Sequence, residues 1–249
     1  MIQPIILAAG RNKRMKQKFL KSLHQLNGKT TLERILDTVE SLGPGIAQPI
    51  IVVSPENKKI IVKMFKNRAQ VITAPSKGTA YAVKVARKQA GRAKYILPLN
   101  GDHPFLQKRT LQRLIMSHRS KKAKLTLQTL VVPYFRGGYS GFKSFGRIIR
   151  KKGKIKEIRE RTETTGREKR IKELNIGLIM ANAPWIWQQL DRLKPHDNGE
   201  YYLTDIIRMA VICGDGINDS RSRDVLSAYS YNSPEDLERL KKIAHRKNL

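Results

Sequence analysis

Short apolar runs alternate with amphipathic segments along the first part of the chain. Each run has the length of a buried strand, and each segment between runs repeats apolar residues at the spacing of one helix face. This alternation is typical of a parallel sheet wrapped by helices, so we predict an α/β fold. The predicted strands are Ile2–Leu7, Ile50–Val53, Gln70–Thr73 and Tyr95–Leu99, and the predicted helices are Thr30–Leu42, Asn57–Lys66 and Thr79–Gly91.

The pattern changes in the middle of the chain and then returns. Residues 136–172 hold many Gly, Lys, Arg and Thr and few core residues, which favours a β-hairpin and loop insertion over the sheet rather than a second domain. We therefore predict one domain over residues 1–249. Its remaining predicted elements are the strands Lys124–Pro133, Glu173–Ala181 and Ser227–Tyr231, and the helices Leu106–Arg119, Pro184–Leu193, Tyr202–Cys213 and Pro234–Arg246.

Composition narrows the class of protein. The chain has 249 residues and 40% hydrophobic residues, which suits a globular domain with a sizeable core. No apolar run approaches the ~20 residues of a membrane span, and the N-terminus lacks a signal-peptide pattern. Cys213 is the only cysteine, so an intrachain disulfide is excluded, and no Cys/His spacing suits zinc. We expect a cytoplasmic protein that has no contact with membranes.

The net charge is unusual. Fifty Lys and Arg stand against twenty Asp and Glu, which gives +30. Such a surplus attracts polyanions, so we expect non-specific binding of nucleic acid. The cations run along the whole chain, and no RNA-binding signature with interleaved aromatics is present. A general compositional bias is the favoured explanation, and a nucleic-acid-binding protein is the alternative from another functional class.

The end of the first predicted strand carries the clearest candidate chemistry. Leu7-Ala8-Ala9-Gly10 ends in small residues that let a ligand approach the backbone, and a cation-rich loop containing Arg14 follows. The sequence therefore predicts a nucleotide loop at the carboxyl end of this strand. An ordinary tight turn followed by solvated cations is the other interpretation.

Two further strand-to-helix turns carry candidate ligands. Asn100-Gly101-Asp102 follows the strand Tyr95–Leu99, so Asp102 lies where open α/β sheets bind ligands. Its carboxylate suits Mg²⁺, although a helix N-cap explains the same residue. At Lys77-Gly78-Thr79, Gly78 lets the backbone pass close to a flat ligand.

Together these motifs resemble the uridylyltransferase domain of bacterial N-acetylglucosamine-1-phosphate uridylyltransferases, in the sugar-nucleotide pyrophosphorylase class. The likeness runs nearly end to end, and its most specific stretch is Glu200-Tyr201-Tyr202-Leu203-Thr204-Asp205. The other matching stretches are Leu7–Gly10 with Arg14-Met15, Lys21, Gly78-Thr79, Gly101-Asp102, Phe145–Ile148, Glu160, Glu173–Gly177 and Asn232.

The resemblance implies a Rossmann-like, mostly parallel sheet of the nucleotide-diphospho-sugar transferase type, with the insertion over a sugar site. It implies Mg²⁺-dependent transfer of UMP from UTP to a sugar 1-phosphate, N-acetylglucosamine 1-phosphate being expected, to give a cell-wall precursor. By this resemblance Arg14, Lys21 and Asp102 are catalytic, and Asp102 and Asn232 hold Mg²⁺. The nucleotide lies at Leu7, Ala8, Ala9, Gly10, Ser76, Gly78, Thr79, Asn100 and Gly101, and the sugar at Gly146, Glu160, Asn175, Tyr202 and Thr204.

The chain departs from the family pattern in several places. Asn12 and Lys13 replace the usual Gly and Thr, and Leu20 replaces the usual Pro. Ser76 lies where a Gln usually reads the uracil edge, so transfer of another nucleotide or to another sugar phosphate is the alternative. Residues 1–249 hold no hexapeptide repeat, so we expect the β-helix acetyltransferase domain of the family to be absent. Because related enzymes trimerise largely through that domain, we expect a monomer.

Overall fold

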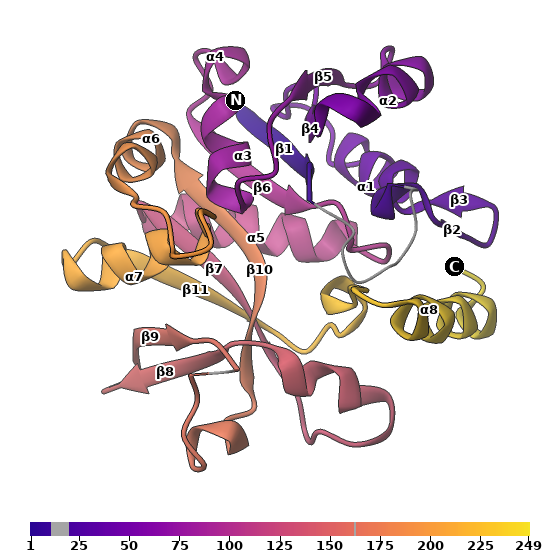
Figure 1. Cartoon of the computed structure of the whole chain (residues 1–249). Coiled ribbons are helices and arrows are strands. Elements are labelled where there is room, and N and C mark those ends of the chain that lie inside the picture. The colour runs from indigo at the N-terminus through magenta and orange to yellow at the C-terminus, as the bar shows by residue number, and fades with distance from the viewer. Residues whose placement is uncertain (11–19, 162) are drawn as a thin grey trace.

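One mixed sheet forms the centre of the molecule. The computed structural model describes residues 1–10, 20–161 and 163–249 (Figure 1). Within them nine strands form a sheet whose main path runs β11-β7-β10-β6-β1-β4-β5, with β8 paired to β10 and β9. These strands are β1 (Ile2–Ala8), β4 (Ile50–Val53), β5 (Gln70–Thr73), β6 (Tyr95–Asn100), β7 (Leu125–Val131), β8 (Arg147–Lys151), β9 (Lys154–Arg159), β10 (Glu173–Asn182) and β11 (Ile217–Ser222).

The strand order places a switch point between β1 and β6. The chain passes from β1 outward through β4 and β5, and then returns to place β6 on the other side of β1. Both neighbours of β1 are parallel to it, whereas β10 is antiparallel to β6 and β7. Ligands of open α/β sheets bind beyond the carboxyl ends of strands at such a switch point.

Helices cover both faces of the sheet because each carries one apolar stripe. Two separate clusters of buried side chains mark the two faces. One cluster holds residues of α1 (Thr31–Glu40), α2 (Lys58–Phe65), α5 (Lys108–Lys121) and α8 (Pro234–Lys247). The other holds residues of α3 (Thr79–Val85), α4 (Arg87–Ala90), α6 (Ala183–Arg192) and α7 (Thr204–Ile212).

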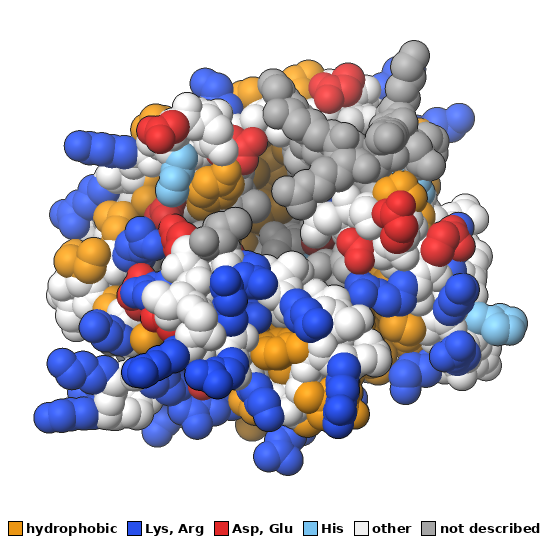
Figure 2. Space-filling view, turned by 60° about the horizontal axis from the view of Figure 1, so that its bottom comes forward, with side chains coloured by type: hydrophobic (Ala, Val, Ile, Leu, Met, Phe, Trp, Pro, Cys, Tyr) orange, Lys and Arg blue, Asp and Glu red, His pale blue; other side chains and the backbone are white. Residues whose placement is uncertain are grey.

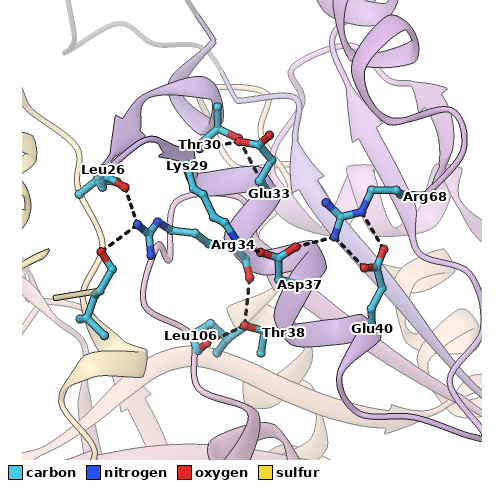
Figure 3. A network of polar contacts seen from close by, with 11 residues as sticks. Leu26, Lys29, Thr30, Glu33, Arg34, Asp37, Thr38, Glu40, Arg68 and Leu106 are labelled. Carbon is cyan, nitrogen blue, oxygen red and sulfur yellow. Dashed lines mark hydrogen bonds and ion pairs between the residues drawn. The ribbon is translucent and has the colours of Figure 1, made fainter.

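A polar network fixes the first helix over the sheet (Figure 3). Thr30 and Glu33 form a reciprocal capping box at the start of α1, which satisfies backbone N–H groups that the helix leaves free. Near its other end, the Arg68 guanidinium donates to Glu40 at 2.7 and 2.9 Å and to Asp37 at 2.7 Å. Arg34 of α1 donates to the Leu26 carbonyl, which ties the helix to the short hairpin of β2 (Gln25–Leu26) and β3 (Lys29–Thr30) that precedes it.

The structure corrects three sequence predictions. Ser227–Tyr231 is not a strand: a 3₁₀ turn covers Leu226–Ala228, and the edge strand is β11. The predicted helix Thr79–Gly91 is divided, because Ala86 ends α3 with N–H bonds to nearer carbonyls. The helix predicted from Tyr202 begins at Thr204, and the N–H of Leu203, the residue before it, is satisfied by the Thr79 hydroxyl.

The predicted insertion contains the hairpin of β8 and β9, which lies at the lower edge of the sheet in Figure 1. Charge is concentrated here. Residues 136–172 carry fourteen Lys and Arg against four Glu, a surplus of ten in 37 residues, against twenty in the other 212. Figure 2 shows Lys and Arg side chains covering the lower part of the molecule. Ten cations of this segment are exposed and form no ion pair within the described part of the chain: Arg136, Lys143, Lys151, Lys152, Lys154, Lys156, Arg167, Lys169, Arg170 and Lys172.

Candidate active site

A cavity of about 510 Å³ opens beyond the carboxyl ends of β1 and β6. Segments far apart in the sequence form its walls: the end of β1, residues 20–22, the turn after β5, the end of β6, the loop before α7 and the segment before α8. Its lining residues are Leu7, Ala8, Ala9, Gly10, Leu20, Lys21, Ser22, Pro75, Ser76, Gly78, Thr79, Ala82, Asn100, Gly101, Asp102, Glu200, Tyr202 and Asn232.

The floor of the cavity is formed where the end of β1 lies close to the residues that follow β6. The Gly101 N–H donates to the Leu7 carbonyl at 3.0 Å, which continues the parallel pairing past the last strand residue. A Cβ on Gly101 would lie 2.8 Å from that carbonyl oxygen, so only glycine fits. The tight contact holds Asp102 directly beside the end of β1.

Three polar side chains meet in the cavity. Lys21 Nζ donates to Asp102 Oδ2 at 2.5 Å and to Asn232 Oδ1 at 2.7 Å. The Lys21 and Asp102 side chains are 19% and 22% exposed, so the pair is largely shielded but open to the cavity. A carboxylate and an amide oxygen therefore share one cation, which the Lys21 ammonium supplies in this structure.

Tyr231 holds the backbone of Lys21 in place. Its buried hydroxyl donates to the Lys21 carbonyl and lies 2.9 Å from the Thr31 hydroxyl, and burial raises the pKa of this phenol. Lys21 Nζ also lies 5.2 Å from the centre of the Tyr231 ring, within cation–π range. Since Asn232 follows Tyr231 directly, one short segment orients both the lysine and one of its acceptors.

The charge state of Asp102 follows from its neighbours. Burial by itself would raise the pKa of this carboxyl, but the Lys21 ammonium and His103 outweigh that effect and lower the pKa below its ordinary value. His103 Nε2 lies 3.7 Å from Asp102 Oδ1, and its Nδ1 bonds to the Ser227 carbonyl at 3.0 Å. Asp102 is therefore an ionised oxygen donor at neutral pH.

This donor set fits a divalent cation such as Mg²⁺. Such ions prefer oxygen ligands and are commonly held by one or two protein groups together with substrate phosphates and water. Asp102 and Asn232 are two oxygen donors that already share a cation. Over residues 1–10, 20–161 and 163–249, no group of three or more His, Cys, Asp or Glu is placed to hold a metal.

The turn after β5 is fixed by the loop before α7. The Tyr201 N–H donates to the Lys77 carbonyl at 2.8 Å, and the Ala80 N–H donates to the Tyr201 carbonyl at 3.0 Å. The Thr79 hydroxyl accepts from the Leu203 N–H at 3.0 Å. Hydrogen bonds therefore join the turn after β5 and the loop before α7, two of the segments that form the cavity wall.

The close contact between the turn after β5 and the loop before α7 requires a glycine at position 78. Its φ is +93°, and a Cβ there would lie 2.3 Å from the Tyr201 carbonyl oxygen. The sequence suggests that Gly78 makes room for a flat ligand. The structure adds a second reason for glycine here, since the backbone of Tyr201 lies where a Cβ would be, while Gly78 also lines the cavity.

Gly78→Ala is expected to destabilise the protein by about 2–4 kcal/mol, because backbone strain and overlap with Tyr201 add. Gly153 is a matched control, since its φ is +76° and no atom lies within 4 Å of a Cβ there. Gly153→Ala should cost about 1–2 kcal/mol, because only the backbone strain applies there. Urea unfolding of both variants measures the difference, and equal losses would show that Tyr201 does not constrain the turn.

Part of the expected sugar site lies together beside the cavity. The Asn175 N–H donates to the Gly146 carbonyl at 2.9 Å, and a Cβ on Gly146 would lie 3.4 Å from Glu160 Oε2. Asn100, which lines the cavity, reaches Gly177 two residues after Asn175. Desolvation raises the pKa of Glu160, and the carboxylates of Glu163 and Asp205 raise it further.

The expected site residues that the structure describes divide into two groups. Thirteen of them line the cavity: Leu7, Ala8, Ala9, Gly10, Lys21, Ser76, Gly78, Thr79, Asn100, Gly101, Asp102, Tyr202 and Asn232. Gly146, Glu160, Asn175 and Thr204 do not line it. Arg14 lies outside the described residues. The lining residues that the expected set omits are Leu20, Ser22, Pro75, Ala82 and Glu200, of which Leu20 and Ser22 flank Lys21 in sequence.

Solved structures with this fold identify its class. A protein from Bacillus anthracis described as a glucose-1-phosphate thymidylyltransferase, in complex with a sucrose, has a TM-score of 0.76 at 16% identity, covering 98% of this chain and 95% of its own. A CMP:2-keto-3-deoxy-manno-octonic acid synthetase complexed with CTP has a TM-score of 0.72 at 11% identity and 99% coverage of both chains. The fold is that of the nucleotidyltransferases, which confirms the predicted fold class.

Sequence comparison then gives the family. The model of the MobA-like NTP transferase domain matches residues 4–171, and the chain belongs to that family. The bifunctional protein GlmU of Buchnera aphidicola is 32% identical over 98% of this chain, and that of Clostridioides difficile is 31% identical over 98%. GlmU of Fervidobacterium nodosum is 34% identical over 83%.

The chain spans about half the length of the curated relatives it matches, 51%, 51% and 43% of these three. Family and relatives confirm the prediction of a nucleotidyltransferase. In the part of the chain that the structure describes, no helix is both long and apolar enough to cross a membrane.

Proposed function

We propose that this nucleotidyltransferase moves UMP from UTP to a sugar 1-phosphate, with N-acetylglucosamine 1-phosphate as the expected acceptor, and releases pyrophosphate. The main support is the convergence of Lys21, Asp102 and Asn232 at the switch point of the sheet. Two oxygen donors that accept a cation, together with the Lys21 ammonium that they now bind, suit a triphosphate and its metal, because both signs of charge are needed around phosphate and metal. The motifs shared with the uridylyltransferases support the same reaction.

The chemistry needs no nucleophile from the protein. A phosphate oxygen of the sugar 1-phosphate forms a bond to the α-phosphorus of UTP, and the bond from that phosphorus to the bridging oxygen of pyrophosphate breaks. Such in-line transfer depends on positioning and on neutralising the charge that grows on the leaving group. Lys21 is the described cation placed to do this, and Arg14 is proposed to act with it.

The proposed cofactor is Mg²⁺ held by Asp102 and Asn232. When bound, it would neutralise phosphate charge and help to align the triphosphate. The chain's own residues prepare the site: Gly101 fixes Asp102 against β1, and Tyr231 fixes Lys21 and carries Asn232. With Asp102 and Asn232 holding the metal, triphosphate oxygens would be the new hydrogen-bond acceptors of the Lys21 ammonium.

The nucleotide base and the sugar are the finer part of the proposal. Ser76, Gly78 and Thr79 line the cavity where the base is expected, and Tyr202 lines the wall where the sugar is expected. The names of the two solved structures mention a thymidylyltransferase and CTP, so this fold is compatible with several bases. Transfer of a different nucleotide is therefore the alternative within the same class.

Pyrophosphate release with four nucleoside triphosphates and a panel of sugar 1-phosphates tests the proposal. We expect release only when a triphosphate, a sugar 1-phosphate and Mg²⁺ are all present, with UTP and N-acetylglucosamine 1-phosphate giving the highest kcat/KM. A higher kcat/KM for another nucleotide would correct the base assignment. Release that does not depend on any sugar phosphate would contradict transfer.

We also infer a second, non-catalytic property, binding of nucleic acid through the segment 136–172. The support is its ten exposed cations, none of which forms an ion pair with another residue that the structure describes. Contacts of this kind lack sequence preference and weaken steeply with salt.

Replacing Lys151, Lys152 and Lys154 with Glu should lower affinity for a mixed-sequence RNA about tenfold or more and reduce its salt dependence. The kcat for transfer should not change. Lys58, Lys59 and Lys63 on α2 are a matched control, because they are also exposed and basic but lie outside the segment. Fluorescence anisotropy at several salt concentrations measures both effects. Equal losses in the two triple variants would show that net charge alone attracts RNA.

A further inference from the structure

The loop that forms the Tyr202 wall is held at two separate places. Its C-terminal part is tied to the turn after β5 by the backbone of Tyr201 and Leu203. Its N-terminal part closes on itself, because the His196 N–H donates to the Glu200 carbonyl at 2.9 Å and the Gly199 N–H donates to the His196 carbonyl at 2.8 Å. The attachment of this N-terminal part to α7 is made by side chains.

His196 makes that second attachment. Its Nε2 lies 2.7 Å from Asp205 Oδ2 in the first turn of α7. Its ring packs on the Tyr202 ring, with 4.7 Å between the ring centres. The Tyr202 hydroxyl in turn accepts from Asn198 Nδ2 at 2.6 Å, and Asn198 Oδ1 accepts from the Glu200 N–H at 2.9 Å.

These contacts fix the positions of Tyr202 and Glu200 in the cavity wall. Both residues line the cavity, whereas His196, Asn198 and Asp205 do not. An exposed His–Asp pair contributes little to overall stability. Its effect here is local, because His196 connects the loop that carries Glu200 to the helix that begins beyond Tyr202.

We propose that His196 is a positioning residue for the acceptor sugar phosphate: through Asp205 and the Tyr202 ring it fixes the wall against which the sugar binds. The proposal rests on the proposed function. It predicts an effect on the sugar phosphate alone. The hydrogen bonds of Tyr201 and Leu203 to the turn after β5, where the nucleotide base is expected, do not involve His196.

Initial rates of pyrophosphate release test this, with UTP and N-acetylglucosamine 1-phosphate varied separately. His196→Ala should raise KM for the sugar phosphate about tenfold or more and leave KM for UTP within about twofold. His196→Gln keeps a donor for Asp205 and should recover part of the loss. His245→Ala on α8 is the control for removing an exposed histidine and should change neither constant.

Hydrogen exchange gives a second measurement that needs no turnover. Peptides covering residues 196–203 should exchange faster in His196→Ala, whereas those covering 77–82 should not change. Equal increases in both KM values, or unchanged exchange in the loop, would overturn the role of His196. A wild-type protein that turns over no sugar phosphate would contradict the proposed function, and the exchange data alone would then decide whether His196 fixes the loop.

Discussion

Asp102→Ala is expected to reduce nucleotide transfer by about 10³-fold or more while the protein remains folded. Asp102 is the one carboxylate among the cavity-lining residues that reaches Lys21, and it is the anionic half of the proposed metal site. Without it, the cation that neutralises the triphosphate has only the amide oxygen of Asn232 as a protein ligand. Steady-state rates at saturating Mg²⁺ measure the loss.

Two controls separate this effect from a change in folding. Glu238→Ala removes an exposed carboxylate on α8 and should leave the rate unchanged. Thermal unfolding of Asp102→Ala should show one cooperative transition, because Gly101 and the β1–β6 pairing do not depend on the carboxylate. Near-normal turnover in this variant would exclude Asp102 as a metal ligand.

Lys21→Met is expected to lower kcat by about 10²–10³-fold, through loss of charge beside the leaving pyrophosphate. The same substitution should strengthen metal binding in protein without nucleotide. The Lys21 ammonium lies 2.5 and 2.7 Å from the two oxygens proposed to hold the metal, so it competes with a metal when no nucleotide is bound. Removing it leaves Asp102 and Asn232 open.

Electron paramagnetic resonance of Mn²⁺ measures that competition without any turnover. In nucleotide-free protein, Lys21→Met should bind Mn²⁺ more tightly than the wild type does, and Lys21→Arg, which keeps a cation, should not. Addition of UTP should strengthen Mn²⁺ binding in the wild type. If Lys21→Met binds Mn²⁺ no better than the wild type, the ammonium and the metal do not share a site.

Part of this site follows from the sequence because parallel strands end at the same edge of a sheet. The runs before Leu7–Gly10 and Asn100–Asp102 identify two strand ends, and their pairing through β1 and β6 brings the two turns together. Lys21 and Asn232 follow no local pattern. They join the site through a hydrogen bond between Tyr231 and Lys21, 210 positions apart, and only the family resemblance points to them.

The last predicted strand is wrong because burial and strand structure are different properties. Ser227, Ala228 and Tyr231 are buried, but their polar groups bond to side chains and turns rather than to a neighbouring strand. The edge strand β11 reads Ile-Asn-Asp-Ser-Arg-Ser and has no apolar alternation, so its pairing with β7 leaves little signal in the sequence.

Sequence patterns also do not predict the site contacts that backbone atoms make or that connect residues within a loop. The packing of Tyr201 on Gly78 depends on backbone atoms, which residue types do not reveal. His196 and Asp205 are nine positions apart, a spacing that no helix or strand period predicts to be adjacent. The charge surplus of residues 136–172, by contrast, is present in the sequence itself and is found by counting within segments.

The central claim is that the cavity joins a nucleotide to a sugar phosphate. Phosphorus-31 NMR of the wild-type protein with UTP, N-acetylglucosamine 1-phosphate and Mg²⁺ tests it most directly, because each product has its own signals. We predict that the UTP and sugar-phosphate signals decay together, while the paired signals of a nucleotide diphosphate sugar and the single signal of pyrophosphate grow in equal amounts. Unchanged UTP, or its conversion to UDP and inorganic phosphate, would contradict the account.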